Sequence, residues 1–153
     1  MKRQIFLIKD FKNKIQEFTN YPDLPIASAI YYQDQMIAFS FNEKEQKNIS
    51  FYHSEILCIQ KASQHLGSWR LNNCTLISSL HPCDLCLEAI KESRIEKVFF
   101  LAYRKERIQK KYPFSLCGGF YHQEEEKRLK NFFQKIRKES CPSGLRSMLG
   151  KHV

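Results

Sequence analysis

The sequence predicts an α/β domain of three layers, an α/β/α sandwich in which helices cover both faces of a mixed five-stranded sheet. Three observations predict this class. Apolar runs with strand character alternate along the chain with segments of helical periodicity. The 153 residues are the size of one ordinary domain, so we expect a single domain over 1–153, with a frayed tail at 140–153. An apolar content of 42% is enough to build a core.

The elements are expected in the order helix, strand, strand, helix, strand, helix, strand, strand, helix. Their expected ranges are 5–18, 25–32, 36–41, 54–65, 74–79, 83–93, 97–103, 114–117 and 121–138. The first helix carries Ile8, Phe11 and Ile15 at helical spacing. The two strands that follow are separated by three residues and should pair as a hairpin. The polar stretch 43–50 has no apolar face and is expected to be a loop.

Later elements are marked by stop signals and aromatic runs. Gly67 is a plausible stop for the helix over 54–65, in which a stripe of Ile56, Ile59 and Leu66 is expected to be buried. Residues 97–103 are continuously apolar and aromatic, which is typical of a strand inside a sheet.

Composition excludes some classes of protein. No apolar run approaches the ~20 residues that span a bilayer, and the apolar start of the chain is too short for a signal peptide, so we expect a cytoplasmic protein. Six cysteines in a chain without a secretion signal favour reduced thiols. The net charge of +9 favours a polyanionic partner such as nucleic acid, although solubility alone also explains it.

The strongest chemical signal is Pro82–Cys86 (PCDLC), read together with His53 and Glu55. Cys83 and Cys86 offer two thiolates from the first turn of one helix, and His53 offers a third ligand from the start of another. Three protein ligands and an open position for water form the catalytic type of zinc site. A redox dithiol, the main competitor, would need neither His53 nor Glu55. The pattern therefore predicts one zinc ion per chain, with Glu55 moving protons.

H-x-E followed by P-C-x-x-C is the pattern of the zinc nucleobase deaminases. With these residues the sequence resembles the cytidine deaminase superfamily, and within it the bacterial tRNA-specific adenosine deaminases, over about residues 5–138. Further stretches that carry the resemblance are Leu24-Pro25-Ile26, Phe41-Asn42, Trp69–Leu76, Ser93-Arg94-Ile95, Val98-Phe99-Phe100 and Phe132-Phe133. The resemblance implies a cytidine-deaminase-like fold and a homodimer that binds the anticodon loop of tRNA. It also implies conversion of the wobble adenosine to inosine by attack of zinc-bound hydroxide on the base.

The resemblance further implies roles for single residues. His53, Cys83 and Cys86 would be the zinc ligands and Glu55 the proton shuttle. Asn42 would hydrogen-bond the base, and the backbone at Ser54 would line the pocket. The alternative for Asn42, an ordinary turn residue at the end of a strand, stays open.

Five positions depart from the family pattern. Ser54 stands where alanine is usual, and Ala27-Ser28 replaces a Gly-Ala pair. His81 replaces a glutamate before Pro82, and we interpret it as a loop histidine near the site. Arg104 replaces an aspartate near the substrate ribose.

Because of the segment 104–113, the sequence does not decide the identity of the substrate. It is basic, and it is shorter than the dozen or so residues that a parallel crossover normally needs, so the last strand is either parallel or antiparallel, with parallel favoured. The alternative to a tRNA substrate is a free nucleobase, nucleoside or nucleotide of the cytosine or guanine type. A third hypothesis is a zinc protein without catalytic activity, against which Glu55 speaks.

Overall fold

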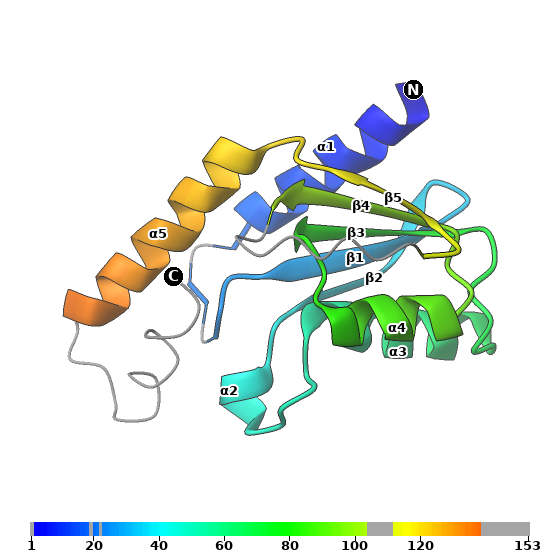
Figure 1. The fold of residues 1–153 in the computed structure, drawn as a ribbon, viewed down its shortest axis with the longest axis horizontal. Coiled ribbons are helices and arrows are strands. Elements are labelled where there is room, and N and C mark those ends of the chain that lie inside the picture. Colours follow the sequence, from blue (N-terminus) through cyan, green and yellow to red (C-terminus); the bar gives the residue numbers. More distant parts are fainter. Residues whose placement is uncertain (1, 19, 22, 104–111, 139–153) are drawn as a thin grey trace.

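A mixed five-stranded sheet in the order β2-β1-β3-β4-β5 forms the middle layer of the protein (Figure 1). This computed structural model describes residues 2–18, 20–21, 23–103 and 112–138. The basic segment at 104–111, with Arg104, and the expected tail at 140–153 lie outside the described residues.

The helices and strands follow the expected order, with one addition. They are α1 (Lys2–Gln16), β1 (Ala27–Tyr32), β2 (Gln35–Phe41), α2 (Lys44–Lys47), α3 (Ser54–Leu66), β3 (Cys74–Leu80), α4 (Asp84–Glu92), β4 (Lys97–Ala102), β5 (Ser115–Gly118) and α5 (His122–Lys138). Helices α3 and α4 lie together on one face of the sheet, and α1 and α5 lie on the other (Figure 1). The α/β/α class predicted from the sequence is confirmed.

Strand pairing combines an antiparallel half with a parallel half. β1 pairs antiparallel with both β2 and β3. Gln33 and Asp34, between β1 and β2, both have positive φ (50° and 65°), as the tight turn of a hairpin requires. β4 is parallel to β3, and β5 is parallel to β4. Of the two orientations left open for the last strand, the structure has the parallel one.

Alternation along the strands divides the core into two halves. Toward α3 and α4 the sheet presents residues such as Ile30, Leu76 and Val98. Toward α1 it presents residues such as Ile77 and Phe99, which pack in one cluster with the buried face of that helix. Each face of the sheet is therefore closed by its own helices, and a residue's place in a strand decides which layer it meets.

Two expectations were wrong. The stretch 43–50 contains the short helix α2, because two backbone N–H groups at its start donate to the Asp23 carboxylate, a contact that is distant in sequence. In α3 the buried residues are Ser54, Glu55, Leu57, Cys58 and Ala62, whereas Ile59 and Leu66 of the expected stripe are only partly buried against the core. The buried face of α3 differs from the expected one because it includes two polar residues of the first turn, Ser54 and Glu55. A search for apolar periodicity does not detect such residues.

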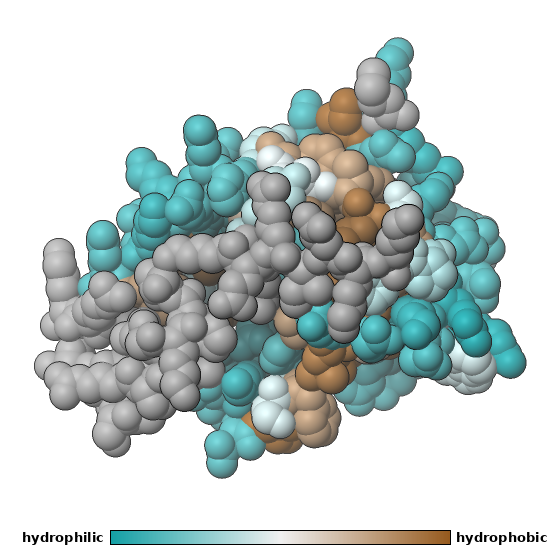
Figure 2. All heavy atoms as spheres, viewed as in Figure 1, coloured by the Kyte–Doolittle hydropathy of each residue, from teal (hydrophilic) through white to brown (hydrophobic). Residues whose placement is uncertain are grey.

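The described surface is largely polar. In the view of Figure 2 the hydrophilic residues cover most of the outline outside the grey atoms, and the hydrophobic ones form smaller groups near the centre, at the lower edge and at the upper end. Among the residues that the structure describes, no helix combines the length and the apolar character needed to cross a bilayer.

Helix α1 should contribute to stability through one face only. Phe11 is fully buried and Phe6, on the same helix, is 58% exposed. Phe11→Ala is expected to lower the free energy of unfolding by about 3–5 kcal/mol through lost burial and a cavity. Phe6→Ala, the matched control, should change it by less than about 0.5 kcal/mol. Urea denaturation measures both, and equal losses would contradict this packing of α1.

Candidate active site

Three candidate metal ligands meet at the N-terminal ends of α3 and α4. His53 is the N-cap residue of α3, Cys83 is the N-cap residue of α4, and Cys86 lies in the first turn of α4. The His53 Nδ1 atom is 3.4 Å from each of the two Sγ atoms, which are 3.5 Å apart. Among the described residues, these three are the His, Cys, Asp or Glu side chains that form a group able to hold a metal.

The spacing of these atoms fits zinc. With Zn–S bonds of about 2.3 Å and Zn–N bonds of about 2.0 Å, tetrahedral geometry places the ligand atoms about 3.5–3.8 Å from one another. The observed separations of 3.4 and 3.5 Å are close to these values. His53 and Cys83 are half-buried whereas Cys86 is buried, so the group is accessible from one side. Three ligands and one accessible side suit a site that also takes water.

Local backbone geometry frees the ligand side chains. The two N-cap residues have extended backbone, with φ/ψ of −77°/148° at His53 and −76°/169° at Cys83. An N-cap side chain often accepts a hydrogen bond from its own helix, but neither of these does. Both side chains therefore point to the shared site, where two helix N-termini add partial positive charge.

The thiol of Cys83 differs from those of Cys86 and Cys74 in the direction of its pKa shift. The hydrogen-bond contact between the Cys83 and Cys86 sulfurs lowers the pKa of Cys83 and raises that of Cys86, while the hydrogen bond to Cys83 raises the pKa of His53. Burial instead raises the pKa of Cys74 to about 11. One thiolate, the form that binds metal, is thus already favoured in the group.

Glu55 lies beside the ligands and is held by buried hydroxyls. Its side chain is 4% exposed. Ser54 Oγ donates to Glu55 Oε2 over 3.1 Å, and Ser78 Oγ donates to Glu55 Oε1 over 3.2 Å. Ser28 Oγ lies 2.8 Å from Ser54 Oγ and 3.2 Å from Ser78 Oγ. Each oxygen of the carboxylate therefore has its own donor.

Asn42 is buried and is held in place by Asp23. Asn42 Nδ2 donates to Asp23 Oδ1 over 2.8 Å, so the amide nitrogen faces the carboxylate. The next residue, Glu43, donates its N–H to the carbonyl of Tyr52, directly before His53. This backbone contact keeps the end of β2 beside the start of α3, as a substrate contact at Asn42 would require.

The other candidate residues take different places. His81 is outside the ligand group: its Nδ1 lies 2.8 Å from the Pro82 carbonyl, and its ring packs edge-on against Phe100. This agrees with a loop histidine near the site. Ser54 is fully buried and its hydroxyl points to Glu55. Arg104 lies outside the described residues.

Sequence reasoning missed three residues of this region. Asp23 and Ser78 were given no role, and Ser28 was noted only as a departure from a pattern. The sequence around a single serine or aspartate does not reveal which distant residues it will hydrogen-bond. The register of β1 with β3, in which Ser28 and Ser78 are direct neighbours, is the information that would have found the serines.

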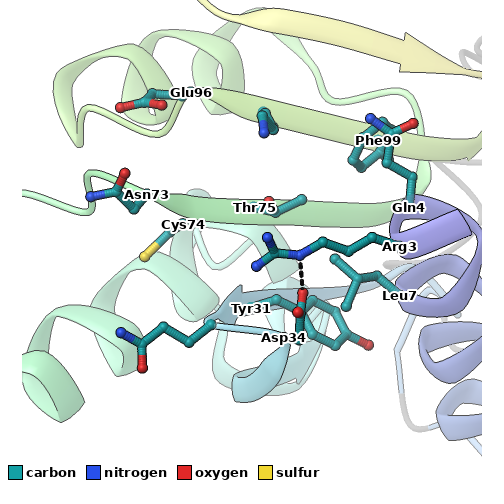
Figure 3. Close-up of a pocket in the computed structure, with 12 residues that line it drawn as sticks. Arg3, Gln4, Leu7, Tyr31, Asp34, Asn73, Cys74, Thr75, Glu96 and Phe99 are labelled. Atoms are coloured by element: carbon teal, nitrogen blue, oxygen red, sulfur yellow. Dashed lines mark hydrogen bonds and ion pairs between the residues drawn. The ribbon is translucent and has the colours of Figure 1, made fainter. Parts of the chain in front are cut away.

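A hollow of about 220 Å³ lies elsewhere, at the end of the sheet where β3 and β4 begin (Figure 3). Its lining includes Asn73, Thr75 and Glu96, and Arg3 pairs there with Asp34. None of the ligand residues lines it.

Comparison with known proteins adds the family. The model of the cytidine and deoxycytidylate deaminase zinc-binding region matches residues 1–102, which include all three candidate ligands and Glu55. A tRNA-specific adenosine deaminase of Bacillus subtilis is 30% identical over 131 residues, covering 76% of this chain and 80% of that one. A second, from Buchnera aphidicola, is 35% identical and covers 60% of each.

Solved structures share the fold. One, from a study of A-to-I editing by tRNA:A34 deaminases, has a TM-score of 0.63 at 22% identity and covers 79% of this chain and 93% of that one. A guanine deaminase of Nitrosomonas europaea has a TM-score of 0.65 at 18% identity, covering 85% and 82%. A guanine deaminase of Bacillus subtilis has a TM-score of 0.51 at 34% identity, over 52% and 51%.

Replacing a ligand should remove the metal without unfolding the core. Cys83→Ser and Cys86→Ser are each expected to lower metal content to less than about a tenth of that of the unaltered protein, because a serine hydroxyl is a poor zinc ligand. Cys117→Ser, at an exposed cysteine, should leave it unchanged. Elemental analysis after dialysis measures the content, and full retention in both ligand variants would contradict the assignment.

Asp23 should matter for stability. It is 4% exposed and accepts hydrogen bonds from Leu24, Asn42, Glu45 and Gln46. Asp23→Ala leaves these donors unpaired and should cost about 2–4 kcal/mol of unfolding free energy. Arg3→Ala, which removes the exposed ion pair with Asp34, should cost less than about 1 kcal/mol in the same urea titration.

Proposed function

The chain belongs to the family of the cytidine and deoxycytidylate deaminase zinc-binding region, and from this premise we propose that it is a zinc-dependent hydrolytic deaminase of the wobble adenosine of tRNA. One observation supports the chemistry above all. A buried carboxylate, Glu55, lies two residues from one ligand of a His/Cys/Cys group whose spacing fits zinc.

The proposed reaction is hydrolysis at the amino-bearing carbon of the base. One C–N bond breaks, one C–O bond forms, water is consumed and ammonia leaves, so adenosine becomes inosine. Zinc, once bound by His53, Cys83 and Cys86, supplies a Lewis acid that brings the pKa of water to about 7. Glu55 would take one proton from the attacking water and give it to a ring nitrogen. It would then take the remaining proton from the new hydroxyl group on the carbon and give it to the departing amine, which leaves as ammonia.

Three observations support tRNA as the substrate. The relatives from Bacillus subtilis and Buchnera aphidicola are named tRNA-specific adenosine deaminases. The net charge of +9 favours a polyanionic partner. The described helix α5 contributes exposed basic side chains, among them Lys127, Lys130 and Lys135. The proposal includes one zinc ion per chain, a homodimer and a cytoplasmic location.

A second candidate is a deaminase of a free nucleobase, nucleoside or nucleotide. The short segment 104–113 favours it, because little chain is available there to hold an anticodon loop. The guanine deaminases among the solved structures share the fold and so allow this alternative.

A substrate panel separates the candidates. The zinc-loaded protein is incubated with tRNA carrying a wobble adenosine, and separately with cytosine, cytidine and guanine. Inosine in the tRNA is the expected result, whereas ammonia from a small substrate alone would establish the second candidate.

Replacement of Glu55 tests the catalytic role. Glu55→Ala should lower kcat by at least about 100-fold with zinc retained, since a positioned acid or base contributes on that order. Glu88→Ala, at an exposed ion pair on α4, is the matched control and should keep full activity. Undiminished activity of Glu55→Ala, or no deamination of any substrate by the unaltered protein, would mean that the protein binds zinc without this chemistry.

A further inference from the structure

Three buried serines surround the carboxylate of Glu55. Ser28, Ser54 and Ser78 are all fully buried, and they come from β1, α3 and β3. We propose that their hydroxyls form a positioning network that holds Glu55 in the orientation it needs to move protons. This inference rests on the proposed function, since it assumes that Glu55 is the proton shuttle.

The donor arrangement fixes both carboxylate oxygens. Ser54 donates to Oε2 over 3.1 Å and Ser78 donates to Oε1 over 3.2 Å. A serine hydroxyl has one hydrogen to donate, and each of these two hydroxyls donates its hydrogen to Glu55. Rotation of the carboxylate would break both hydrogen bonds at once.

Ser28 contacts the hydroxyls of both donors, Ser54 and Ser78. Its hydroxyl is 2.8 Å from Ser54 Oγ and 3.2 Å from Ser78 Oγ. Because those oxygens already donate to Glu55, they meet Ser28 as acceptors, and the single hydrogen of the Ser28 hydroxyl goes to one of them at a time. This contact orients the hydroxyls of Ser54 and Ser78, and through them it acts on Glu55.

The backbone places the three hydroxyls together. Ser28 and Ser78 are direct neighbours in the pairing of β1 with β3. Their side chains share the face of Ile30 and Leu76, which is the face covered by α3. The next residue, Ser79, points to the opposite face, and its hydroxyl accepts from the N–H of Ala27.

Burial explains why the carboxylate needs this network. A carboxylate removed from water is costly unless hydrogen-bond donors replace its hydration, and Glu55 is only 4% exposed. Two of the serines, Ser28 and Ser54, stand where the chain departs from the family pattern to which it was likened. The network is therefore a property of this chain, beyond the family motif.

Removing the hydroxyls one at a time tests the inference. Ser54→Ala and Ser78→Ala are each expected to lower kcat about 10- to 100-fold, the usual range for residues that orient a catalytic group. KM should stay unchanged, since the buried hydroxyls do not touch substrate. Ser28→Ala should give a smaller fall in kcat, because it acts through the other two. Zinc content should match that of the unaltered protein in all three.

Ser79→Ala is the matched control. It removes a hydroxyl that is 2% exposed from the same strand, but one without contact to Glu55, so kcat should be unchanged. If the Ser54 and Ser78 variants keep the kcat of the Ser79 variant, the inference is overturned. If Ser78→Ala does not fold, Ser54→Ala decides alone, since alanine is the usual residue there in the family it resembles.

A second measurement does not depend on activity. Urea unfolding of the zinc-loaded protein is compared for Ser78→Ala, Glu55→Ala and the double variant. If Ser78 donates to Glu55, its replacement should shift the midpoint less when Glu55 is already absent. Strictly additive shifts would overturn the network. If the unaltered protein deaminates no substrate, the proposed function fails, while this cycle still reports on the contact itself.

Discussion

The N-termini of α3 and α4 meet beyond the end of β3, and the arrangement of the site depends on this convergence. Each helix begins directly at a candidate metal ligand, His53 for α3 and Cys83 for α4. The end of β3 is in turn fixed to β4, since the N–H of His81 donates to the carbonyl of Ala102. The position of the ligands therefore follows from the packing of helices on the sheet, and the connecting loops add little freedom.

The same geometry allows a polar cluster inside the protein. The face of the sheet toward α3 is apolar along most of its length, with Ile30 and Leu76 as examples. At the end nearest the ligands it carries hydroxyls, which accept and donate among themselves and to Glu55. A fully connected polar network of this kind tends to rigidify its surroundings, whereas unpaired groups there would destabilise them. The carboxylate of Glu55 thus sits on rigid elements.

Much of this could be predicted from local patterns. Periodicity located the long helices and strands, and the ligands stood out because Cys83 and Cys86 are three apart and Glu55 is two residues from His53. Features that depend on distant partners were not predictable. Helix α2 depends on the carboxylate of Asp23, a distant partner. For β5 the sequence favoured the parallel direction that the structure has, but the antiparallel one stayed open because pairing with β4 is not encoded locally.

The register of β1 with β3 determines what a misaligned strand would do to the site. The side-chain period of a strand is two residues, so a slip of one residue exchanges the two faces of a strand. Such a slip in β3 would turn Ile77 or Ser79 toward α3 in place of Ser78. The backbone hydrogen bonds could form again and the ligands on α4 would still exist, yet Glu55 would face different neighbours. Correct strand registration is thus a requirement of the chemistry as well as of the core.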